Sequence, residues 1–350
     1  MLKKMTFGFM VLVLVLPLLV GCQAQPTEPP VVEVAPEEAV NLTVAIVAGG
    51  EIGDKGFVDS ANEGLLQLEE EFGINTLMLQ GRDEPDRYLD LLITAGEEAD
   101  LVFVVPGYFF EEQLAEVVPQ FPDTTFVYVD GITSLEGMSS IRYLEHEGSF
   151  LAGALAALLT ERTDVLDLVD EKTVIGEMGG ADMPVIHNFM VGFEQGAQYI
   201  NPDITIISRF AGTHFDPAAG RETALAMYEA GADIVFQIAG PTGLGVFEAA
   251  REAGRYVIGV DTDQRPLAPE NTLASMRKRV GESIYDFTVM FMNGETDEGQ
   301  AYLYGLAKNG VGIDYSDIDP DLVPQDVRDQ IEELRQMIID GEIVVEQYTE

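Results

Sequence analysis

Residues 101–129 have the sequence LVFVVPGYFFEEQLAEVVPQFPDTTFVYV. Two short apolar runs, 101–105 and 126–129, flank a segment with the periodicity of a helix at 111–118. Fully apolar strands separated by a helix are typical of a parallel sheet that is covered by helices on both faces. This stretch therefore predicts a β-α-β unit and an α/β fold.

The same alternation continues in both directions along the chain. Further strands are predicted at 44–47, 76–79, 174–176, 204–207, 234–237 and 257–260, and helices lie between them. A long Ala/Leu helix at 149–159 separates two similar blocks, and 350 residues with 47% apolar side chains suffice for two cores. The sequence therefore predicts two lobes.

Polar or glycine-rich turns follow most of the predicted strands. They lie at 49–57, 106–108, 130–131, 179–182, 240–245 and 261–264. In open α/β sheets, ligands bind beyond the carboxyl ends of the strands. We therefore expect a small-molecule site in a cleft between the two lobes.

The chain is strongly acidic. It has 19 Lys and Arg residues against 61 Asp and Glu residues, a net charge of −42. A surface built from these residues repels polyphosphates, so nucleic acid is not an expected partner. Anionic small ligands are also disfavoured at long range. Solubility and a salty habitat both explain the acidity, and the composition does not distinguish them.

The first 41 residues read as an export and anchoring segment. Lys3 and Lys4 precede an uncharged run at 5–20, as in a signal peptide, so we assign 1–21 to one. The run ends at Leu19-Val20-Gly21-Cys22, which resembles the bacterial lipobox, where a lipid is attached to the cysteine. Cys22 is the only cysteine, so its lipidation excludes disulfides and cysteine-based sites. The acidic, proline-containing segment 22–41 is predicted to be a flexible tether.

Motifs of enzymes are absent. The sequence contains no Walker A loop and no G-x-S-x-G motif, and its three histidines lack the spacing of metal ligands. Residues 240–245 (GPTGLG) reverse the spacing of a dinucleotide loop. They predict a turn that lets backbone N–H groups approach a ligand or lets a helix pack closely. We therefore expect no catalytic residue, no metal site and no cofactor.

Six segments together carry a family resemblance. They are 54–57 (DKGF), 143–153 (YLEHEGSFLAG), 215–220 (FDPAAG), 231–240 (GADIVFQIAG), 258–264 (IGVDTDQ) and 275–278 (SMRK). In this order they resemble the basic membrane protein (BMP) family, lipoproteins that serve ABC importers and are represented by the purine nucleoside receptor of spirochaetes. The resemblance extends from about 44 to 345.

This resemblance implies a periplasmic-binding-protein type I fold, in which two Rossmann-like lobes are joined by a multi-strand hinge and hold a nucleoside. We expect lobe 1 at 42–146 plus about 265–292, and lobe 2 at 147–264 plus part of the C-terminal segment. Hinges are expected at 142–148, 261–266 and 290–294. The implied partners are the nucleoside and an ABC permease. We also expect a monomer, lipid-anchored to the cell membrane and facing outside the cytoplasm, in the periplasm or on the outer leaflet.

The resemblance also implies ligand contacts. Phe57 matches the aromatic residue that stacks on the base, and stacking needs only an exposed ring at a loop tip. Asp261 matches the aspartate whose carboxylate accepts hydrogen bonds from both ribose hydroxyls. Lys278 matches the lysine that donates to ribose oxygens and offsets the charge of Asp261. Each residue also has a structural alternative: Phe57 could be a core ring, Asp261 a helix cap and Lys278 a solvated surface lysine.

A second stacking ring is expected within 213–216, where His214 and Phe215 remain equal candidates, and Gly240 is expected to bring backbone near the ligand. One departure concerns the base edge. Val58 replaces the asparagine that the family usually has there, which leaves Asp54, the match to a family aspartate, or Asp59 for that contact. A purine is the expectation, but the base is not assigned, because an apolar side chain discriminates poorly.

Other functions remain open at this point. The nearest alternative is a binding protein for another uncharged solute, such as a sugar. A sensor that reports ligand occupancy to a membrane partner would have the same fold. A surface nucleoside hydrolase would instead need a metal-binding carboxylate cluster near the strand ends.

Overall fold

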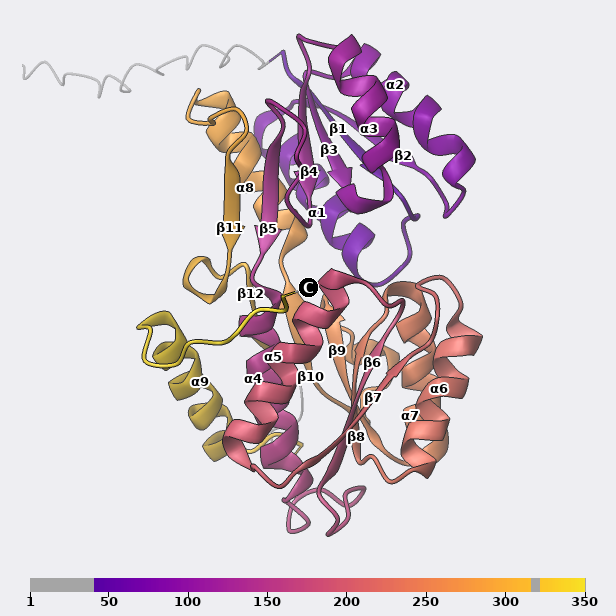
Figure 1. Ribbon diagram of the computed structural model, residues 1–350, viewed down its shortest axis with the longest axis vertical. Coiled ribbons are helices and arrows are strands. Elements are labelled where there is room, and N and C mark those ends of the chain that lie inside the picture. Colours follow the sequence, from indigo (N-terminus) through magenta and orange to yellow (C-terminus); the bar gives the residue numbers. More distant parts are fainter. Residues whose placement is uncertain (1–40, 316–321, 350) are drawn as a thin grey trace, which may run out of the picture. The chain divides into compact units, whose positions relative to one another are not determined.

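The computed structural model describes residues 41–315 and 322–349. Within them, the chain builds two separate sheets of mostly parallel strands, each flanked by helices (Figure 1). The predicted signal peptide at 1–21, Cys22 and the tether up to residue 40 lie outside the described residues. The α/β prediction is confirmed.

The first lobe is built on a six-stranded sheet in the order β11-β5-β4-β3-β1-β2, in which neighbouring strands of the described residues pair in parallel. The first lobe contains β1 (Thr43–Ala48), α1 (Phe57–Phe72), β2 (Asn75–Gln80), α2 (Tyr88–Glu98), β3 (Leu101–Val105), α3 (Glu111–Val117), β4 (Thr125–Val129), β5 (Ser139–Tyr143), α8 (Val280–Met292) and β11 (Ala301–Tyr304).

The second lobe has the same design, with its sheet in the order β12-β10-β9-β8-β6-β7; only β12 runs antiparallel to its neighbour. The second lobe contains α4 (Glu145–Thr160), β6 (Val174–Gly179), α5 (Pro184–Ile200), β7 (Thr205–Phe210), α6 (Pro217–Glu229), β8 (Ile234–Ile238), α7 (Leu244–Ala253), β9 (Tyr256–Asp261), β10 (Thr272–Lys278), β12 (Val311–Asp314) and α9 (Gln325–Ile339).

Local sequence signals explain several helix ends. Gly73 follows α1 at φ 63°, and Gly254 follows α7 at φ 59°, a left-handed conformation that glycine adopts without strain. At the start of α6, the Asp216 carboxylate accepts hydrogen bonds from the N–H groups of Ala218 and Ala219. Pro217 occupies the first helical position, where its missing N–H costs nothing.

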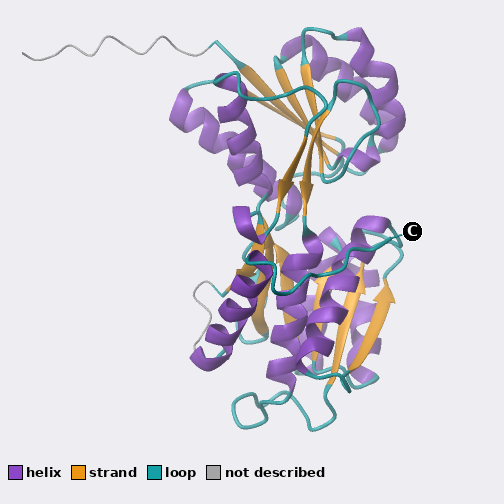
Figure 2. Cartoon of the chain, turned by 60° about the vertical axis from the view of Figure 1, so that its left-hand side comes forward, coloured by secondary structure: helices purple, strands orange, loops and turns teal. Residues whose placement is uncertain are grey.

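In the part of the chain that the structure describes, three segments connect the lobes (Figure 2). The chain crosses between β5 and α4 at Leu144, between β10 and α8 at Arg279, and between β11 and β12 over 305–310. Hydrogen bonds join these crossings, because the Leu144 N–H donates to Tyr304 O (3.1 Å) and the Arg279 N–H donates to Gly310 O (2.9 Å). The three crossings thus form one connected hinge.

Two of the expected hinge positions differ from these crossings. Residues 265–292 were expected in lobe 1, with hinges at 261–266 and 290–294, yet β10 is a strand of the second sheet, paired with β9 in parallel. The chain returns to the first lobe only at Val280, where α8 begins. The physical reason is that β10 pairs with β9 on one side and with β12 on the other, which places it inside the second sheet. Only the expected hinge at 142–148 overlaps a crossing.

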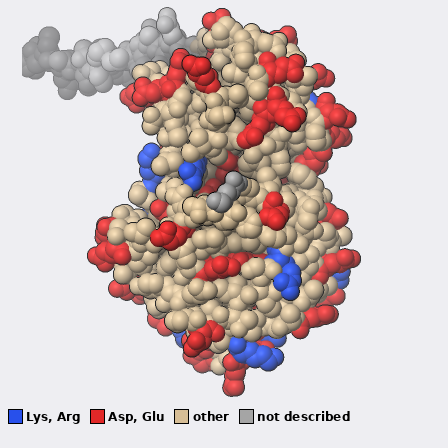
Figure 3. All heavy atoms as spheres, in the orientation of Figure 1, with Lys and Arg blue, Asp and Glu red and all other residues tan. Residues whose placement is uncertain are grey.

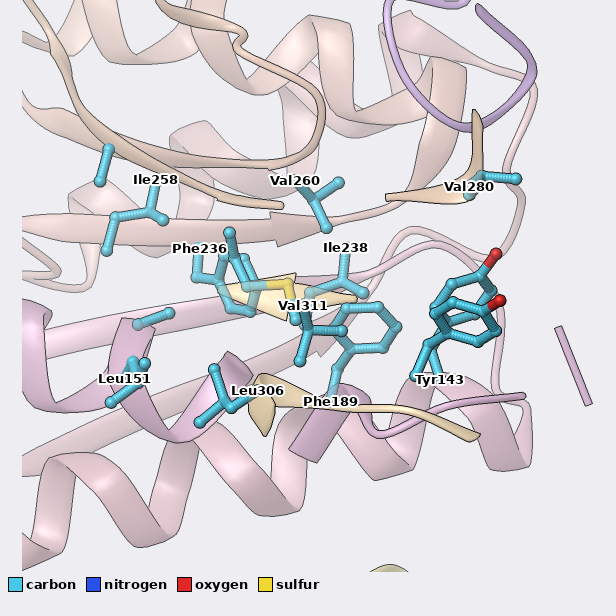
Figure 4. Packing of buried hydrophobic residues seen from close by; sticks show 14 of the residues in the cluster. Tyr143, Leu151, Phe189, Phe236, Ile238, Ile258, Val260, Val280, Leu306 and Val311 are labelled. Carbon is cyan, nitrogen blue, oxygen red and sulfur yellow. The ribbon is translucent and has the colours of Figure 1, made fainter. Parts of the chain in front are cut away.

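The largest hydrophobic cluster reaches the hinge from both lobes. Figure 4 shows part of it, with Phe236 and Ile238 of β8 beside Val260 of β9. Tyr143 of β5 and Val280 of α8 lie at one end of the labelled group. Because the same cluster also contains residues of the first sheet, the packed core continues through the hinge.

A buried carboxyl group interrupts the second core. Glu177 of β6 is fully buried, and the Ser208 Oγ–H of the neighbouring strand donates to its Oε1 (2.7 Å). Burial raises the pKa of Glu177 to about 8, and nearby Glu194 adds to the shift. The folded protein therefore keeps this proton at neutral pH, whereas the unfolded chain releases it.

We expect Glu177→Gln to stabilise the protein at pH 8 by about 1–3 kcal/mol and to have no such effect at pH 4. The folded pKa is raised, so the wild-type chain loses stability as the pH rises above the unfolded value of 4.5 toward 8. The side-chain oxygen of glutamine still accepts the hydrogen bond from Ser208, and the amide has no proton to release as the pH rises. Urea unfolding at both pH values measures this, with the exposed Glu222→Gln as control. A stability gain of equal size at pH 4 would contradict the prediction.

The surface of the described residues is acidic on both lobes. Figure 3 shows Asp and Glu side chains spread over the visible face, with few Lys and Arg side chains among them. Every helix in residues 41–315 and 322–349 is too short or too polar to span a bilayer.

Candidate functional site

Loops at the carboxyl ends of strands from both lobes enclose a hollow. Its outer chamber has a volume of about 280 Å³ and is lined by residues that follow β1, β2, β3, β7 and β8. An inner chamber of about 70 Å³ lies deeper. Phe57, Tyr108, His214 and Gly240 line both chambers, so the two spaces belong to one cleft.

Phe57 reaches the cleft as the first residue of α1. The loop before it makes a close approach to the other lobe, because a Cβ atom added at Gly56 would lie 3.3 Å from Asp261 Oδ2. A glycine at this position lets the lobes meet without moving the carboxylate. The Lys55 carbonyl accepts hydrogen bonds from Thr262 Oγ1 (2.7 Å) and Gln264 Nε2 (2.8 Å) across the cleft.

The inner chamber ends at a buried charge cluster around Lys278. This lysine is 2% exposed, forms an ion pair with Asp130 and lies 3.1 Å from Glu145 Oε1. Burial alone lowers the pKa of Lys278, but Asp130, Glu145 and Asp261 together outweigh it and raise that pKa above its usual value. The amine is therefore firmly protonated, and one cation faces three carboxylates.

Aromatic rings surround the same ammonium group. Lys278 Nζ lies 5.2 Å from the ring centroid of Phe57, 5.0 Å from that of Tyr143 and 5.1 Å from that of Phe189. Ring faces attract a cation, which compensates part of its lost hydration. The lysine thus occupies one fixed place at the hinge.

Asp261 ends β9 with φ 66°, a left-handed conformation that aspartate tolerates better than most residues. Arg277 Nε–H donates to its carbonyl oxygen (3.1 Å), which ties the backbone to β10. No hydrogen bond from the described residues reaches its side-chain oxygens. Burial raises the pKa of this carboxyl to about 7, with Asp54 and Asp130 adding to the shift while Lys278 and Arg277 oppose it. The carboxylate therefore faces the inner chamber with free acceptor positions.

Asp54 and Asp59, the two candidates for the base edge, both hold the loop. Asp54 lines the outer chamber, but its carboxylate accepts hydrogen bonds from the N–H groups of Gly56, Val58 and Asp59 at 2.8–3.0 Å. Burial raises the pKa of Asp54, although these three donors lower it. The Asp59 carboxylate accepts from the N–H groups of Gly53 and Lys55 and lines a different hollow of about 460 Å³.

The two candidates for a second ring lie on the opposite lobe. His214 lines both chambers and packs on Gly180, where a Cβ atom would come within 2.4 Å of its Cδ2. Burial lowers the pKa of His214 to about 4, so the ring is neutral. Phe215 lines only the outer chamber, is 38% exposed, and lies 5.9 Å from the Phe109 ring of the first lobe. Gly240 has φ 54°, a left-handed conformation that glycine adopts without strain.

Several lining residues were not singled out from the sequence. Tyr108, Asp130 and Asp83 all lie in turns that follow strands of the first sheet. Burial raises the pKa of Asp130 to about 6, with Glu145 adding to the shift and Lys278 opposing it. A carboxyl group directly after an apolar strand was the available signal for Asp130. In residues 41–315 and 322–349, no three His, Cys, Asp or Glu side chains are arranged to hold a metal ion.

Comparisons with known proteins identify the family of the chain. The profile of the Bmp family, described as "ABC transporter substrate-binding protein PnrA-like", matches residues 41–349. Basic membrane protein A1 of Borrelia garinii subsp. bavariensis is 33% identical over 310 residues, which cover 86% of this chain and 87% of that protein. The CD4+ T-cell-stimulating antigen of Listeria monocytogenes serovar 1/2a is 31% identical and covers 87% of this chain and 88% of its own.

Solved structures give the same fold. An ABC transporter solute-binding protein from Aeropyrum pernix K1 superposes with a TM-score of 0.76 at 25% identity, covering 88% of this chain and 94% of that chain. The arabinose-binding component from Shewanella sp. ANA-3 gives a TM-score of 0.58 at 17% identity, covering 87% and 100%. The periplasmic-binding-protein type I fold is thus confirmed. Substrate-binding proteins of ABC transporters bind a small ligand outside the cytoplasm and work with a permease. The chain belongs to the Bmp family of PnrA-like ABC transporter substrate-binding proteins.

Proposed function

We propose that this protein binds a nucleoside in the interlobe cleft and delivers it to an ABC permease. The observation that carries this proposal is the pairing of an aromatic wall, Phe57, with the free carboxylate of Asp261 in one chamber. A ring stacks on any base with a gain of about 1–3 kcal/mol. Two carboxylate oxygens suit the two neighbouring hydroxyls of ribose, because ionised acceptors make strong hydrogen bonds.

The charges of the cleft favour a neutral ligand. Asp54, Asp83, Asp130 and Asp261 line its two chambers, whereas Lys278 is the one cation among the lining residues of these two chambers. A phosphate group would meet these carboxylates at short range in a partly desolvated space, where like charges repel strongly. A nucleoside is therefore favoured over a nucleotide.

Closure of the lobes completes the site in this proposal. The hydrogen bonds from Thr262 and Gln264 to the Lys55 carbonyl join the lobes beside Asp261. A ligand held by Phe57 on one lobe and Asp261 on the other stabilises the closed form by the contacts that only closure provides. The closed form is then the one that docks on the permease.

Anchoring at the membrane belongs to the same proposal. The lipobox-like sequence before Cys22 supports attachment by lipid, with 22–41 as a tether and the binding body as a monomer outside the cytoplasm. One lipid chain binds a bilayer only weakly, so stable anchoring needs more than one. Mass spectrometry of the membrane-extracted protein tests the modification at Cys22.

We expect Phe57→Ala to weaken nucleoside binding about tenfold or more, since the ring supplies stacking and closes the wall of both chambers. Isothermal titration with purine and pyrimidine nucleosides, free bases and pentoses measures the effect and separates nucleosides from sugars. The exposed ring of Tyr199, remote from the cleft, provides the control Tyr199→Ala. Unchanged affinity in Phe57→Ala, or wild-type binding of pentoses but not nucleosides, would refute the proposal.

A further inference from the structure

The outer chamber contains three carboxylates with different surroundings. Those of Glu51, Asp54 and Asp83 all line it. Glu51 lies 3.6 Å from Arg82 at the exposed surface, and Asp54 accepts three backbone hydrogen bonds. The Asp83 carboxylate accepts none from the described residues, although its Oδ1 is shielded from solvent. Oδ1 is turned toward Gly50, so Oδ2, which also lacks a donor from the described residues, is the acceptor that a ligand in the chamber can reach.

The backbone holds Asp83 firmly in place. Arg82 and Asp83 both have positive φ, at 56° and 59°, in the turn after β2. The N–H groups of Gly81, Arg82 and Asp83 donate to the carbonyl oxygens of residues 48, 50 and 49, at 2.7–3.1 Å. Uncommon backbone conformations persist where the surrounding structure enforces them, often at ligand sites. The turn is therefore tied to the loop after β1 that lines the chamber.

Asp83 also lies next to the residue that departs from the family pattern. A Cβ atom added at Gly50 would be 3.5 Å from Asp83 Oδ1 and 3.5 Å from Val58 Cγ2. Val58 offers a base edge no hydrogen bond, so Asp83 is the neighbouring group that can. Nearby N–H donors are already used, because Ile52 donates to Gln80 and Gly53 donates to Asp59. This end of the chamber therefore presents acceptors.

We propose that Asp83 selects the base by accepting hydrogen bonds at its accessible oxygen, Oδ2, from two adjacent N–H groups on the ligand edge. This rests on the proposed function and names its ligand class, a nucleoside with a guanine-type edge that carries a ring N–H beside an exocyclic amine. An ionised carboxylate only accepts, and one of its oxygens has two lone-pair positions, so Oδ2 can take both N–H groups and favours an edge that carries both. Burial, with Glu51 and Asp54, raises the pKa of Asp83 to about 6, which leaves it largely ionised at neutral pH.

The test compares guanosine with inosine, which lacks the amine, by isothermal titration on the full chain after removal of bound ligand. We expect the wild-type protein to bind guanosine at least about tenfold more tightly than inosine. Asp83→Asn should lose about tenfold or more for guanosine and bring the two affinities together. Asparagine tolerates positive φ, so the turn should keep its conformation. Glu84→Gln, next in the chain, exposed and outside the chamber, should change neither affinity.

The outcomes separate this inference from the proposed function. Wild-type binding of nucleosides with equal affinity for guanosine and inosine, or an Asp83→Asn protein that keeps the preference, overturns the role of Asp83 and leaves nucleoside binding intact. No binding of any nucleoside by the wild-type protein overturns both. A thermal melt of Asp83→Asn that matches the wild type shows that lost affinity is not lost folding; a lowered melt with the guanosine preference retained also counts against the role.

Discussion

Replacing Lys278 with methionine should lower the free energy of unfolding by about 3–5 kcal/mol at pH 8. The substitution leaves Asp130, Glu145 and Asp261 buried around the hinge without the one cation that faces them. Removing one partner of a buried ion pair is costly because the remaining charge has lost both its hydration and its counter-ion. Urea unfolding measures the change, with Lys172→Met, at an exposed ion pair with Asp170, as control.

The loss of stability in Lys278→Met should shrink on acidification. Even beside Lys278, burial holds the pKa of Asp130 at about 6 and that of Asp261 at about 7. Raised folded pKa values make these carboxyls destabilise the fold as the pH rises above their unfolded values near 4, and protonation removes the penalty at lower pH. At pH 5 we therefore expect a smaller deficit than at pH 8. Adding Asp130→Asn should restore part of the stability at pH 8.

Two results would contradict this account of the hinge cluster. One is a deficit of the same size at pH 5 and pH 8, which would mean that lost packing of the lysine stem, not charge, explains it. The other is a deficit no larger than that of Lys172→Met, since exposed ion pairs contribute little.

Asp261→Asn should weaken nucleoside binding at least about tenfold at pH 8, or about 1.4 kcal/mol, with little effect on folding. Asparagine tolerates the positive φ of this position, and Arg277 still holds the backbone carbonyl. The change therefore tests the carboxylate. Asp263→Asn, two residues further on and outside both chambers, is the matched control.

The pH dependence of binding gives a second measure of Asp261. Its pKa of about 7 in the free protein means that part of the population is protonated at pH 6. Hydroxyl donors of a ligand favour the ionised form, so wild-type affinity should rise between pH 6 and pH 8. Asp261→Asn should show a flatter profile, with Asp83 and Asp130, whose pKa values are both raised to about 6, supplying what remains. A variant with wild-type affinity and a wild-type pH profile would remove Asp261 from the site.

The arrangement of strands was accessible from the sequence. The predicted strand at 101–105 has the observed bounds, and the other predicted strands differ by a few residues at their ends. Fully buried strands are apolar throughout, so composition alone marks them. The long helix was expected at 149–159 but begins at Glu145, because Glu145 and His146, buried in the first turn, do not look apolar.

Strands β5, β10, β11 and β12 were not predicted. β5 and β10 are interrupted by polar residues such as Arg142 and Arg277, and β11 and β12 are four residues long, so none of them forms a long apolar run. Each pairs with a strand far away in the sequence, and such pairing leaves no local signal. The misplaced hinges have the same origin, since the return of the chain at Arg279 depends on these pairings.

For the site, the family resemblance supplied Phe57, Asp261 and Lys278 as candidates and implied the role of each. Which carboxylates surround Lys278 depends on segments about 150 residues apart, since Asp130 lies that far from it in the chain. The oxygens that Asp54 uses within its own loop, and the lack of a donor at Asp83, depend on the folded loop conformation. Residue types carry propensity and charge along the chain, which were enough for the fold class and the acidity, and six motifs were enough for the family. Burial and pairing arise when distant loops meet, so the pKa values and the free acceptors of the cleft exist only in the folded molecule.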